Sequence, residues 1–273
     1  MTADILIPAL ATVDRMLAVD VAYTVSRMRV LERIPDNPVG IAFHEIDTAA
    51  IALMSRFLPA FNRVIGLRAG QEARLEEIVG WYREHGVRPT FEMVPAHFTA
   101  SLGGELARLG FFQSGFHAVL IGAPQVHAGR TGQENAARVR TDDEMERYLD
   151  AYVAGWGIPP DAHAQFKANV RPWLHEPGWS LYLAEIDGRP AAAATLFVRD
   201  RVGYLADAAT DPALRGRGLQ GALLDRRIAD AAEQGVDFVF SGAAPFSTSH
   251  RNMERAGLRI AFMRSLWTPI GAS

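Results

Sequence analysis

The chain carries a glycine-rich loop between an apolar strand and an amphipathic helix, and this succession constrains its fold more than any other feature. Residues 202–210 are typical of a strand, and three glycines lie between Arg215 and Ala222. Glycines let a backbone approach a ligand closely and adopt dihedral angles closed to other residues. The first helical turn presents N–H groups without partners inside the helix, beside the cations of Arg215 and Arg217. The pattern predicts a pyrophosphate site.

A tight strand-to-helix turn with two solvated arginines is the alternative explanation of this loop. A glycine pattern alone would favour that alternative. The strand before the loop, the helix after it and the two arginines together favour anion binding. A nucleoside triphosphate is disfavoured as the ligand, because no Lys-Ser or Lys-Thr pair follows the glycines.

The overall composition sets limits on partners. The 273 residues suit one large domain or two of ordinary size, and a hydrophobic content of 49% is ample for a packed core. Charged residues make up 22% and the formal net charge is −3, which argues against a general nucleic-acid surface and against an anionic membrane as partner. We therefore expect a soluble globular protein that binds neither.

The chain contains no cysteine, which excludes disulfides, thiolate metal sites and any mechanism that holds an acyl group on a protein thiol. Its eight histidines show no spacing typical of metal ligands, so no metal site is predicted. Residues 1–10 lack the basic and apolar regions of a signal peptide. No apolar run approaches membrane-spanning length. We expect a cytoplasmic location.

Periodicity in the first half of the chain predicts alternating helices and strands. Helices are expected over residues 14–33, 73–85 and 101–109, and strands over 40–45, 61–67, 90–95 and 117–121. Residues 49–57 are apolar, but their mixture of residue types does not separate helix from strand.

The second half begins with residues 137–140 and then a helix to residue 155, at whose start Thr141 and Glu144 are expected to cap each other. In the helix after the glycine-rich loop, Asp225 and Asp230 are expected to face water. The other predicted elements are a helix over 162–173, strands over 179–186, 190–198, 202–210 and 236–240, a helix over 247–256 and a closing strand that reaches Trp267.

The two halves share an order of elements: helix, Gly-Val, apolar strand, short helix, Gly-apolar pair and closing strand. We interpret this order as an old duplication. Residues 125–136 have the composition of a linker, so the predicted domains are 1–124 and 137–273. The first half has Gly66–Gln71 where the second has its loop, without the paired arginines and close glycines. Only the second half is therefore predicted to bind a cofactor.

The loop resembles the signature of the GNAT superfamily of acyl-CoA N-acyltransferases: Gln or Arg, two residues, Gly, one residue, then Gly or Ala. Arg215-Gly216-Arg217-Gly218-Leu219 matches the first five places. Gln220 stands in the last place, where the signature has Gly or Ala. The stretch from Ser247 to Leu258 is similar to the family's second motif. The resemblance implies an α/β (α+β) fold of two GNAT-like domains, the first one degenerate, each with a central mixed, mostly antiparallel sheet flanked by helices.

The resemblance also implies acetyl-CoA as cofactor and direct attack of an amine on its thioester. The pyrophosphate would lie on the loop amides, the pantetheine along the preceding strand, and a serine and an asparagine would border the CoA arm. The residues implied to bind the cofactor are Ala208, Ala209, Thr210, Arg215, Gly216, Arg217, Gly218, Leu219, Gln220, Gly221, Ala222, Ser249 and Asn252.

The proton-transfer groups are less clear, because Met253 stands where many family members have a tyrosine acid. Candidates to replace it are Asp207, Tyr204 and Ser249, with Glu185 and His250 as further ones, although each also has a purely structural explanation. An acetyltransferase is the leading hypothesis, with a small-molecule or peptide amine as acceptor and a homodimer left open. The alternative hypothesis is a non-catalytic CoA-binding regulatory or structural module.

Overall fold

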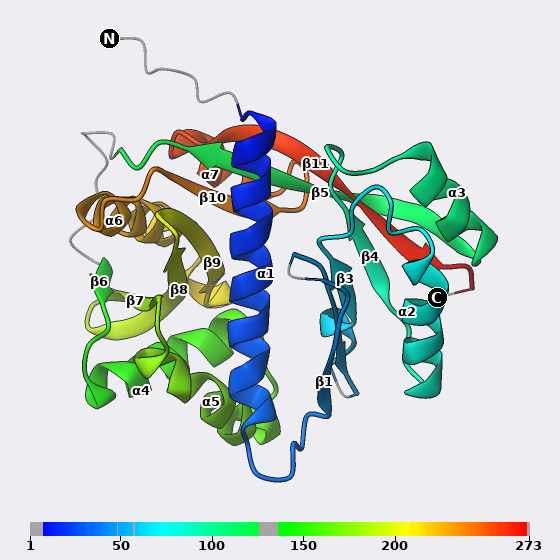
Figure 1. Cartoon of the computed structure of the whole chain (residues 1–273). Helices are drawn as coiled ribbons and strands as arrows, with labels where there is room; N and C mark the ends of the chain where they lie inside the picture. The colour runs from blue at the N-terminus through cyan, green and yellow to red at the C-terminus, as the bar shows by residue number, and fades with distance from the viewer. Residues whose placement is uncertain (1–7, 48, 57, 126–135, 272–273) are drawn as a thin grey trace. The chain divides into compact units, whose positions relative to one another are not determined.

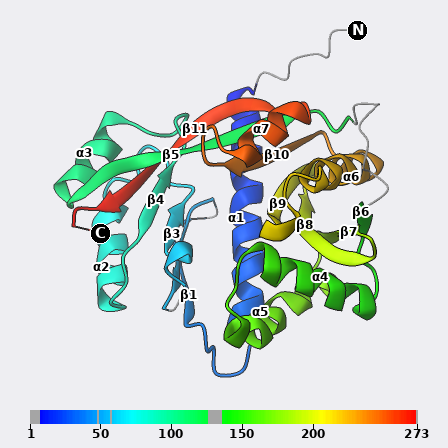
Figure 2. The ribbon, with the colours of Figure 1, turned by 180° about the vertical axis from the view of Figure 1, so that it is seen from behind.

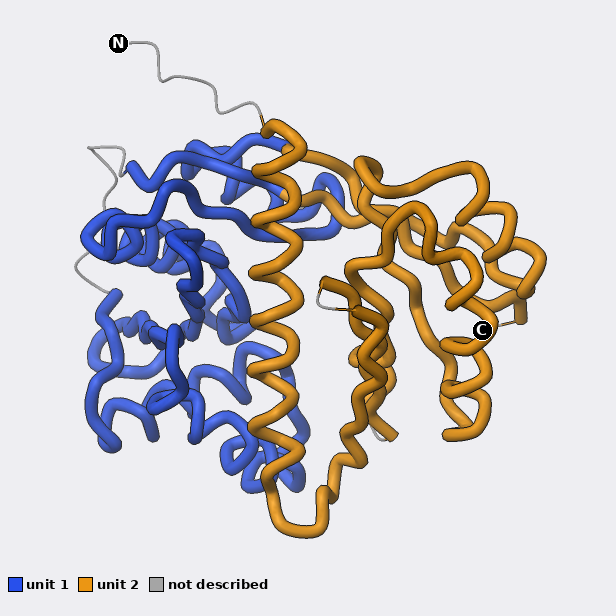
Figure 3. The backbone as a smooth tube through the Cα atoms, viewed as in Figure 1, with its two compact units in different colours: residues 1–7, 120–260 blue, residues 8–119, 261–273 orange. Residues whose placement is uncertain are grey.

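The computed structural model describes residues 8–47, 49–56, 58–125 and 136–271. They form two compact units, which Figure 3 shows in separate colours. Unit 1 contains residues 120–260, and unit 2 contains residues 8–119 and 261–271. Strands β5 (Phe111–Gly122) and β11 (Arg259–Pro269) each have residues in both units. Each unit has a central, mostly antiparallel sheet flanked by helices, so the predicted fold class is confirmed.

Unit 2 orders its strands β1-β2-β3-β4-β11-β5. Strands β3 and β4 pair in parallel, whereas β1–β2, β2–β3 and β4–β11 are antiparallel. The elements are α1 (Leu10–Glu32), β1 (Ile41–Glu45), β2 (Ile51–Ser55), β3 (Arg63–Ile65), α2 (Arg74–Glu84), β4 (Thr90–Met93) and α3 (Ala100–Arg108), with a short 3₁₀ helix at Pro59–Phe61.

Strand β2 explains why the sequence around residues 49–57 was ambiguous. All five of its residues are buried, so the strand lacks the apolar and polar alternation of a half-exposed strand. Ala52 and Met54 pack in a core cluster with residues of α2 and α3. Leu53 packs with Met28 and Leu31 of α1. The sheet of unit 2 is thus covered on both faces.

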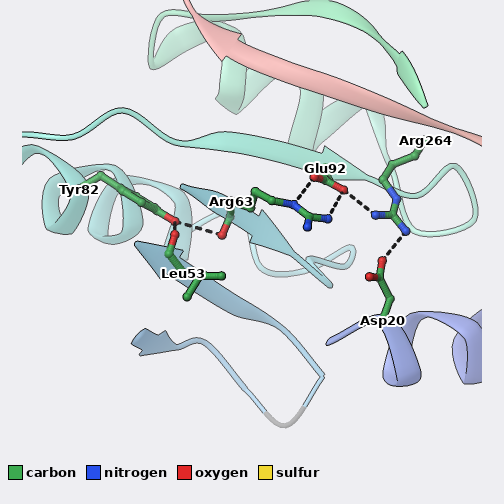
Figure 4. A network of polar contacts seen from close by, with 6 residues as sticks. All are labelled: Asp20, Leu53, Arg63, Tyr82, Glu92 and Arg264. Carbon is green, nitrogen blue, oxygen red and sulfur yellow. Dashed lines mark hydrogen bonds and ion pairs between the residues drawn. The ribbon is translucent and has the colours of Figure 1, made fainter. Parts of the chain in front are cut away.

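A network of buried charges joins four elements of unit 2 (Figure 4). Arg264 of β11 donates through Nη2 to Asp20 of α1 at 2.6 Å and through Nη1 to Glu92 of β4 at 2.5 Å. Arg63 of β3 forms a bidentate pair with the same glutamate, and its Nη2 lies 2.9 Å from Oε2. Burial alone would raise the pKa of Glu92, but the charges and hydrogen bonds of Arg63 and Arg264 lower it to about 2.

Unit 1 orders its strands β5-β10-β9-β8-β7-β6, and β9 and β10 run parallel. Helix α6 lies on one side of strands β7–β9 and helices α4 and α5 on the other (Figures 1 and 2). The elements are β6 (Ala136–Arg138), α4 (Asp142–Gly155), α5 (His163–Val170), β7 (Trp179–Ile186), β8 (Arg189–Arg199), β9 (Val202–Thr210), α6 (Leu219–Glu233), β10 (Phe238–Ala243) and α7 (Thr248–Arg255).

The reciprocal cap at the start of α4 is confirmed. Thr141 Oγ1 accepts from the N–H of Glu144 at 3.2 Å, and Glu144 Oε2 accepts from the N–H of Thr141 at 3.1 Å. The single helix predicted over 162–173 is wrong. Helix α5 ends at Val170 and a 3₁₀ helix follows over Arg171–His175, because Pro172 cannot donate to an α-helical ladder.

The expectation that Asp225 and Asp230 of α6 face water is also wrong, since they are only 3% and 5% exposed. Asp230 Oδ2 accepts a hydrogen bond from the Tyr182 hydroxyl at 2.9 Å. This carboxylate raises the pKa of Tyr182, adding to the effect of burial. The buried face of α6 therefore includes polar residues as well as apolar ones, because the sheet supplies a hydrogen-bond partner for Asp230.

The predicted linker lies outside the described residues except at its two ends, and the domain boundaries stay a prediction. Both units contain the order strand, helix, strand, helix with a parallel pair of strands: β3-α2-β4-α3 in unit 2 and β9-α6-β10-α7 in unit 1. Within the described residues, no helix has the length and apolar character needed to cross a bilayer.

Candidate functional site

The glycine-rich loop leads directly into the N-terminus of α6. Gly216 and Gly218 have φ angles of 80° and 79°, and Gly218 is the N-cap residue of the helix. A residue with a side chain rarely adopts such angles, so the turn needs glycine there. No side chain caps this end of the helix and no acidic residue lies in its first turn. The first N–H groups of α6 are therefore available to an anion.

A cavity of about 950 Å³ opens at this helix end. Arg215 and Arg217 line it and are otherwise exposed to solvent. The structure brings every residue predicted to bind the cofactor to this one cavity: Ala208, Ala209, Thr210, Arg215, Gly216, Arg217, Gly218, Leu219, Gln220, Gly221, Ala222, Ser249 and Asn252.

Gly155 and Trp156, which were not predicted to bind the cofactor, also line this cavity. A Cβ atom at Gly155 would lie 2.8 Å from Ala209 Cβ and 3.0 Å from Thr210 N. The end of α4 therefore approaches the edge of β9 more closely than any other residue type would allow. In the sequence, Gly155 is a glycine at the end of a predicted helix, and an ordinary helix C-cap explains such a glycine equally well.

Strand β9 bulges just before this edge. Thr195 of β8 pairs with Ala206, but Ala193 pairs with Ala209, so β9 has one more residue than β8 between the two pairs. Asp207 lies in the bulge with a φ angle of 47°. The bulge takes residues 207 and 208 out of the regular pairing with β8, and this region lies between the first cavity and a second one.

The second cavity has a volume of about 350 Å³. All three residues predicted to be catalytic, Tyr204, Asp207 and Ser249, line it. Met253 lines it as well, at the position where the family resemblance leads one to expect a tyrosine. Four residues line both cavities: Trp156, Ala208, Gln220 and Ser249. The anion site at α6 and the candidate catalytic groups are therefore adjacent.

Arg227 of α6 also lines the second cavity, and no sequence pattern pointed to it. Its side chain is 1% exposed. Nη1 donates to the carbonyl oxygens of Thr195 at 2.9 Å and Ala206 at 3.2 Å, and Nε donates to that of Leu223 at 3.0 Å. Burial lowers the pKa of Arg227 to about 10, with Tyr182, Tyr148 and Asp207 opposing the shift. The guanidinium thus remains charged at neutral pH.

The two further candidates, Glu185 and His250, line neither cavity. Glu185 is paired with Arg147. His250 is buried, with 4% of its surface exposed. Its Nδ1 accepts from the N–H of Phe246 at 2.8 Å, which holds the turn before α7. Tyr204 stacks on Phe240 with ring centroids 4.5 Å apart.

The corresponding loop of unit 2 is less suited to an anion, because one of its amides is already bonded and Glu76 and Glu77 lie in the first turn of α2. The N–H of Arg68 donates to Oε1 of Gln71 at 2.8 Å, and the Arg68 side chain pairs with Asp14 at 3.2 Å. The described residues contain no cluster of three or more His, Cys, Asp or Glu side chains that could hold a metal ion.

Residues 125–246 match the family model of the acetyltransferase (GNAT) domain. No curated protein matches the chain. Among solved structures, a GCN5-related N-acetyltransferase from Kribbella flavida is 18% identical, with a TM-score of 0.57, over 94% of this chain and 96% of the other. One from Sphaerobacter thermophilus is 14% identical, with a TM-score of 0.58, over 96% and 93%.

A tandem GNAT protein from the clavulanic acid biosynthesis pathway is also similar. It is 14% identical, with a TM-score of 0.56, over 94% of this chain and 97% of the other. These likenesses show a shared GNAT-like fold along nearly the whole chain. The matched family range contains the glycine-rich loop, α6 and the bulge of β9.

Proposed function

We propose that this protein is an acetyltransferase that moves the acetyl group of acetyl-CoA directly to an amine. One observation carries the proposal: the residues expected to bind the cofactor, drawn from β9, the loop, α6 and α7, line a single cavity at an uncapped helix N-terminus. That environment suits a pyrophosphate, because N–H donors, the positive helix end and two arginines converge on it.

The fit extends along the rest of the cofactor. The amides of residues 217–222 and the side chains of Arg215 and Arg217 would hold the pyrophosphate. The edge of β9 at residues 208–210 would pair with the amide groups of the pantetheine arm, as an added strand does. Ser249 and Asn252 of α7 would border that arm.

Acetyl-CoA supplies a thioester carbonyl, so that a C–N bond to the acceptor forms as the C–S bond breaks and CoA leaves as a thiol. In the second cavity, Asp207 would take the proton from the attacking amine, since no other carboxylate lines that cavity among the described residues. Tyr204 and Ser249 present hydroxyl groups on the same cavity and could return a proton to the sulfur.

Replacing Asp207 by asparagine is expected to lower kcat by about 100-fold or more, the range found when a general base is lost. Asparagine tolerates the left-handed φ of 47° as aspartate does, so the bulge should persist. Steady-state kinetics with the best acceptor amine measure the effect. A Glu185→Gln variant is the control, because Glu185 lines neither cavity. If the Asp207→Asn variant has the same kcat as the control, Asp207 is not the general base.

A Gly155→Ala substitution is expected to weaken acetyl-CoA binding by about tenfold. The added methyl group would push on Ala209 and Thr210, and a displacement near 1 Å at a binding edge has large consequences. Calorimetry measures the affinity. Gly80→Ala is the control, because Gly80 is also helical and a Cβ there meets nothing within 4 Å. Equal affinity in both variants would mean that the β9 edge does not contact the cofactor.

Met253 at the tyrosine position keeps a second candidate function open, a CoA-binding module without turnover. Release of free thiol from acetyl-CoA, followed across a panel of amines, separates the two. Sustained amine-dependent release supports the enzyme. Saturable acetyl-CoA binding without release for any amine would support the module.

A further inference from the structure

We propose that Arg227 is a positioning residue that fixes the bulge of β9, and with it the backbone beside the reacting thioester. The proposal rests on the acetyltransferase function proposed above. Arg227 does not touch the glycine-rich loop and does not line the first cavity. Its role would be exerted through the backbone carbonyls that it binds.

The contacts place Arg227 where the two strands fall out of register. One nitrogen, Nη1, donates to the carbonyls of Thr195 on β8 and Ala206 on β9. These two residues form the last regular pair before the bulge. Asp207 follows directly with its left-handed φ of 47°. A single guanidinium thus binds both strands next to the point where residues 207 and 208 leave the register.

A charged side chain is unusual at a buried helix position that packs on a sheet. Removing a charge from water is expensive, and an apolar residue would pack on the sheet at lower cost. The neighbours of Arg227 on the same helix, Leu224 and Ile228, are buried and apolar in the ordinary way. Three backbone carbonyls accept hydrogen bonds from the Arg227 guanidinium, and the carboxylate of Asp207 adds an electrostatic attraction.

Helix α6 connects this clamp to the anion site. The helix begins at Leu219, so Arg227 lies about two turns from the N-terminus that would hold the pyrophosphate. A helix of this length is rigid over two turns. The same element therefore sets the position of the cofactor at one end and the position of the bulge further along, which fixes the thioester relative to Asp207.

Three variants test the proposal: Arg227→Met, Arg227→Lys and, as the matched control, Arg226→Met. Arg226 is the neighbouring residue on α6, and its side chain is 38% exposed and pairs with Asp230 at 2.9 Å. Arg227→Met is expected to lower kcat by about 100-fold while the Kd of acetyl-CoA changes less than about threefold. Arg227→Lys is expected to recover part of the loss, and Arg226→Met to behave as the wild type.

Amide hydrogen exchange supplies a readout that does not depend on activity. Arg227→Met should speed exchange at residues 206–209 relative to Arg226→Met, with no change in the core of β8 and β10. Wild-type protein that neither binds nor turns over acetyl-CoA would end the proposed function, whereas the exchange data would still test the clamp. Unchanged kcat and unchanged exchange in Arg227→Met would overturn the inference.

Two further outcomes would also overturn it. An equal loss of acetyl-CoA affinity and kcat in Arg227→Met would mean general disruption of the cofactor site. A wild-type preference for succinyl-CoA over acetyl-CoA that Arg227→Met abolishes would make Arg227 a ligand for an acyl carboxylate instead of a positioning residue.

Discussion

Replacing Gly218 by valine is expected to reduce the affinity for acetyl-CoA by about 100-fold or more, equivalent to about 3 kcal/mol. Gly218 caps α6 with a φ of 79°, a conformation that a β-branched residue avoids. The chain would relieve the strain by rotating the turn, which moves the N–H groups of the first turn away from the anion. Calorimetric titration of the variant with acetyl-CoA measures the loss.

Gly235→Val provides the matched control at the other end of the same helix. Gly235 has a φ of 68°, and a Cβ atom at either glycine would meet nothing within 4 Å. The two substitutions therefore introduce similar backbone strain, but only Gly218 lines the cavity. Gly235→Val should lower the melting temperature about as much as Gly218→Val and keep wild-type affinity. Equal losses of affinity in both variants would refute a specific role for the loop.

Replacing Glu92 by glutamine is expected to destabilise the protein by about 3 to 5 kcal/mol, the range for breaking a buried ion pair from one side. Glu92 is 9% exposed and neutralises the half-buried Arg63 and the buried Arg264, which would both lose their counter-charge on β4. Urea unfolding of unit 2, followed by the fluorescence of Trp81, measures the effect. Glu105→Gln is the control, because Glu105 pairs with Arg108 only at the surface, and it should unfold as the wild type does.

The same glutamate predicts a pH dependence of stability. Its pKa is about 2 in the folded protein, against an ordinary value of 4.5 for a glutamate. A carboxyl group with a lowered folded pKa stabilises the fold above its unfolded pKa and loses that contribution as the pH falls. Stability should therefore decline between about pH 4.5 and pH 2, by on the order of 3 kcal/mol from this group. Glu92→Gln should flatten the decline, and an unchanged pH profile would contradict the assignment.

The grouping of the loop residues around one cavity could be predicted because its signal is local. The loop, its two arginines and its glycines are consecutive in the sequence, and the strand and helix beside them have clear periodicity. Residues from α7 could be added only through the family resemblance, because Ser249 and Asn252 carry no pattern of their own. The capping pair of Thr141 and Glu144 was predictable for the same reason, since both partners lie within one turn.

The features that were missed depend on partners distant in the sequence. Asp20 and Arg264 are separated by 244 positions, and neither residue type predicts its own burial. Arg227 looks like one more polar residue of α6 until the carbonyls of two strands are placed beside it. Asp230 was expected at the surface because its hydrogen-bond donor, the Tyr182 hydroxyl, belongs to β7.

Titration of acetyl-CoA into the full chain by calorimetry tests the central claim most directly. The account predicts saturable binding at one site per chain, competition by CoA and no competition by ATP. One site is expected because the first turn of α2 in unit 2 carries Glu76 and Glu77, while the N-terminus of α6 in unit 1 is uncapped and has no acidic residue in its first turn. A titration that shows no saturable binding of acetyl-CoA to the unmodified protein would contradict the account.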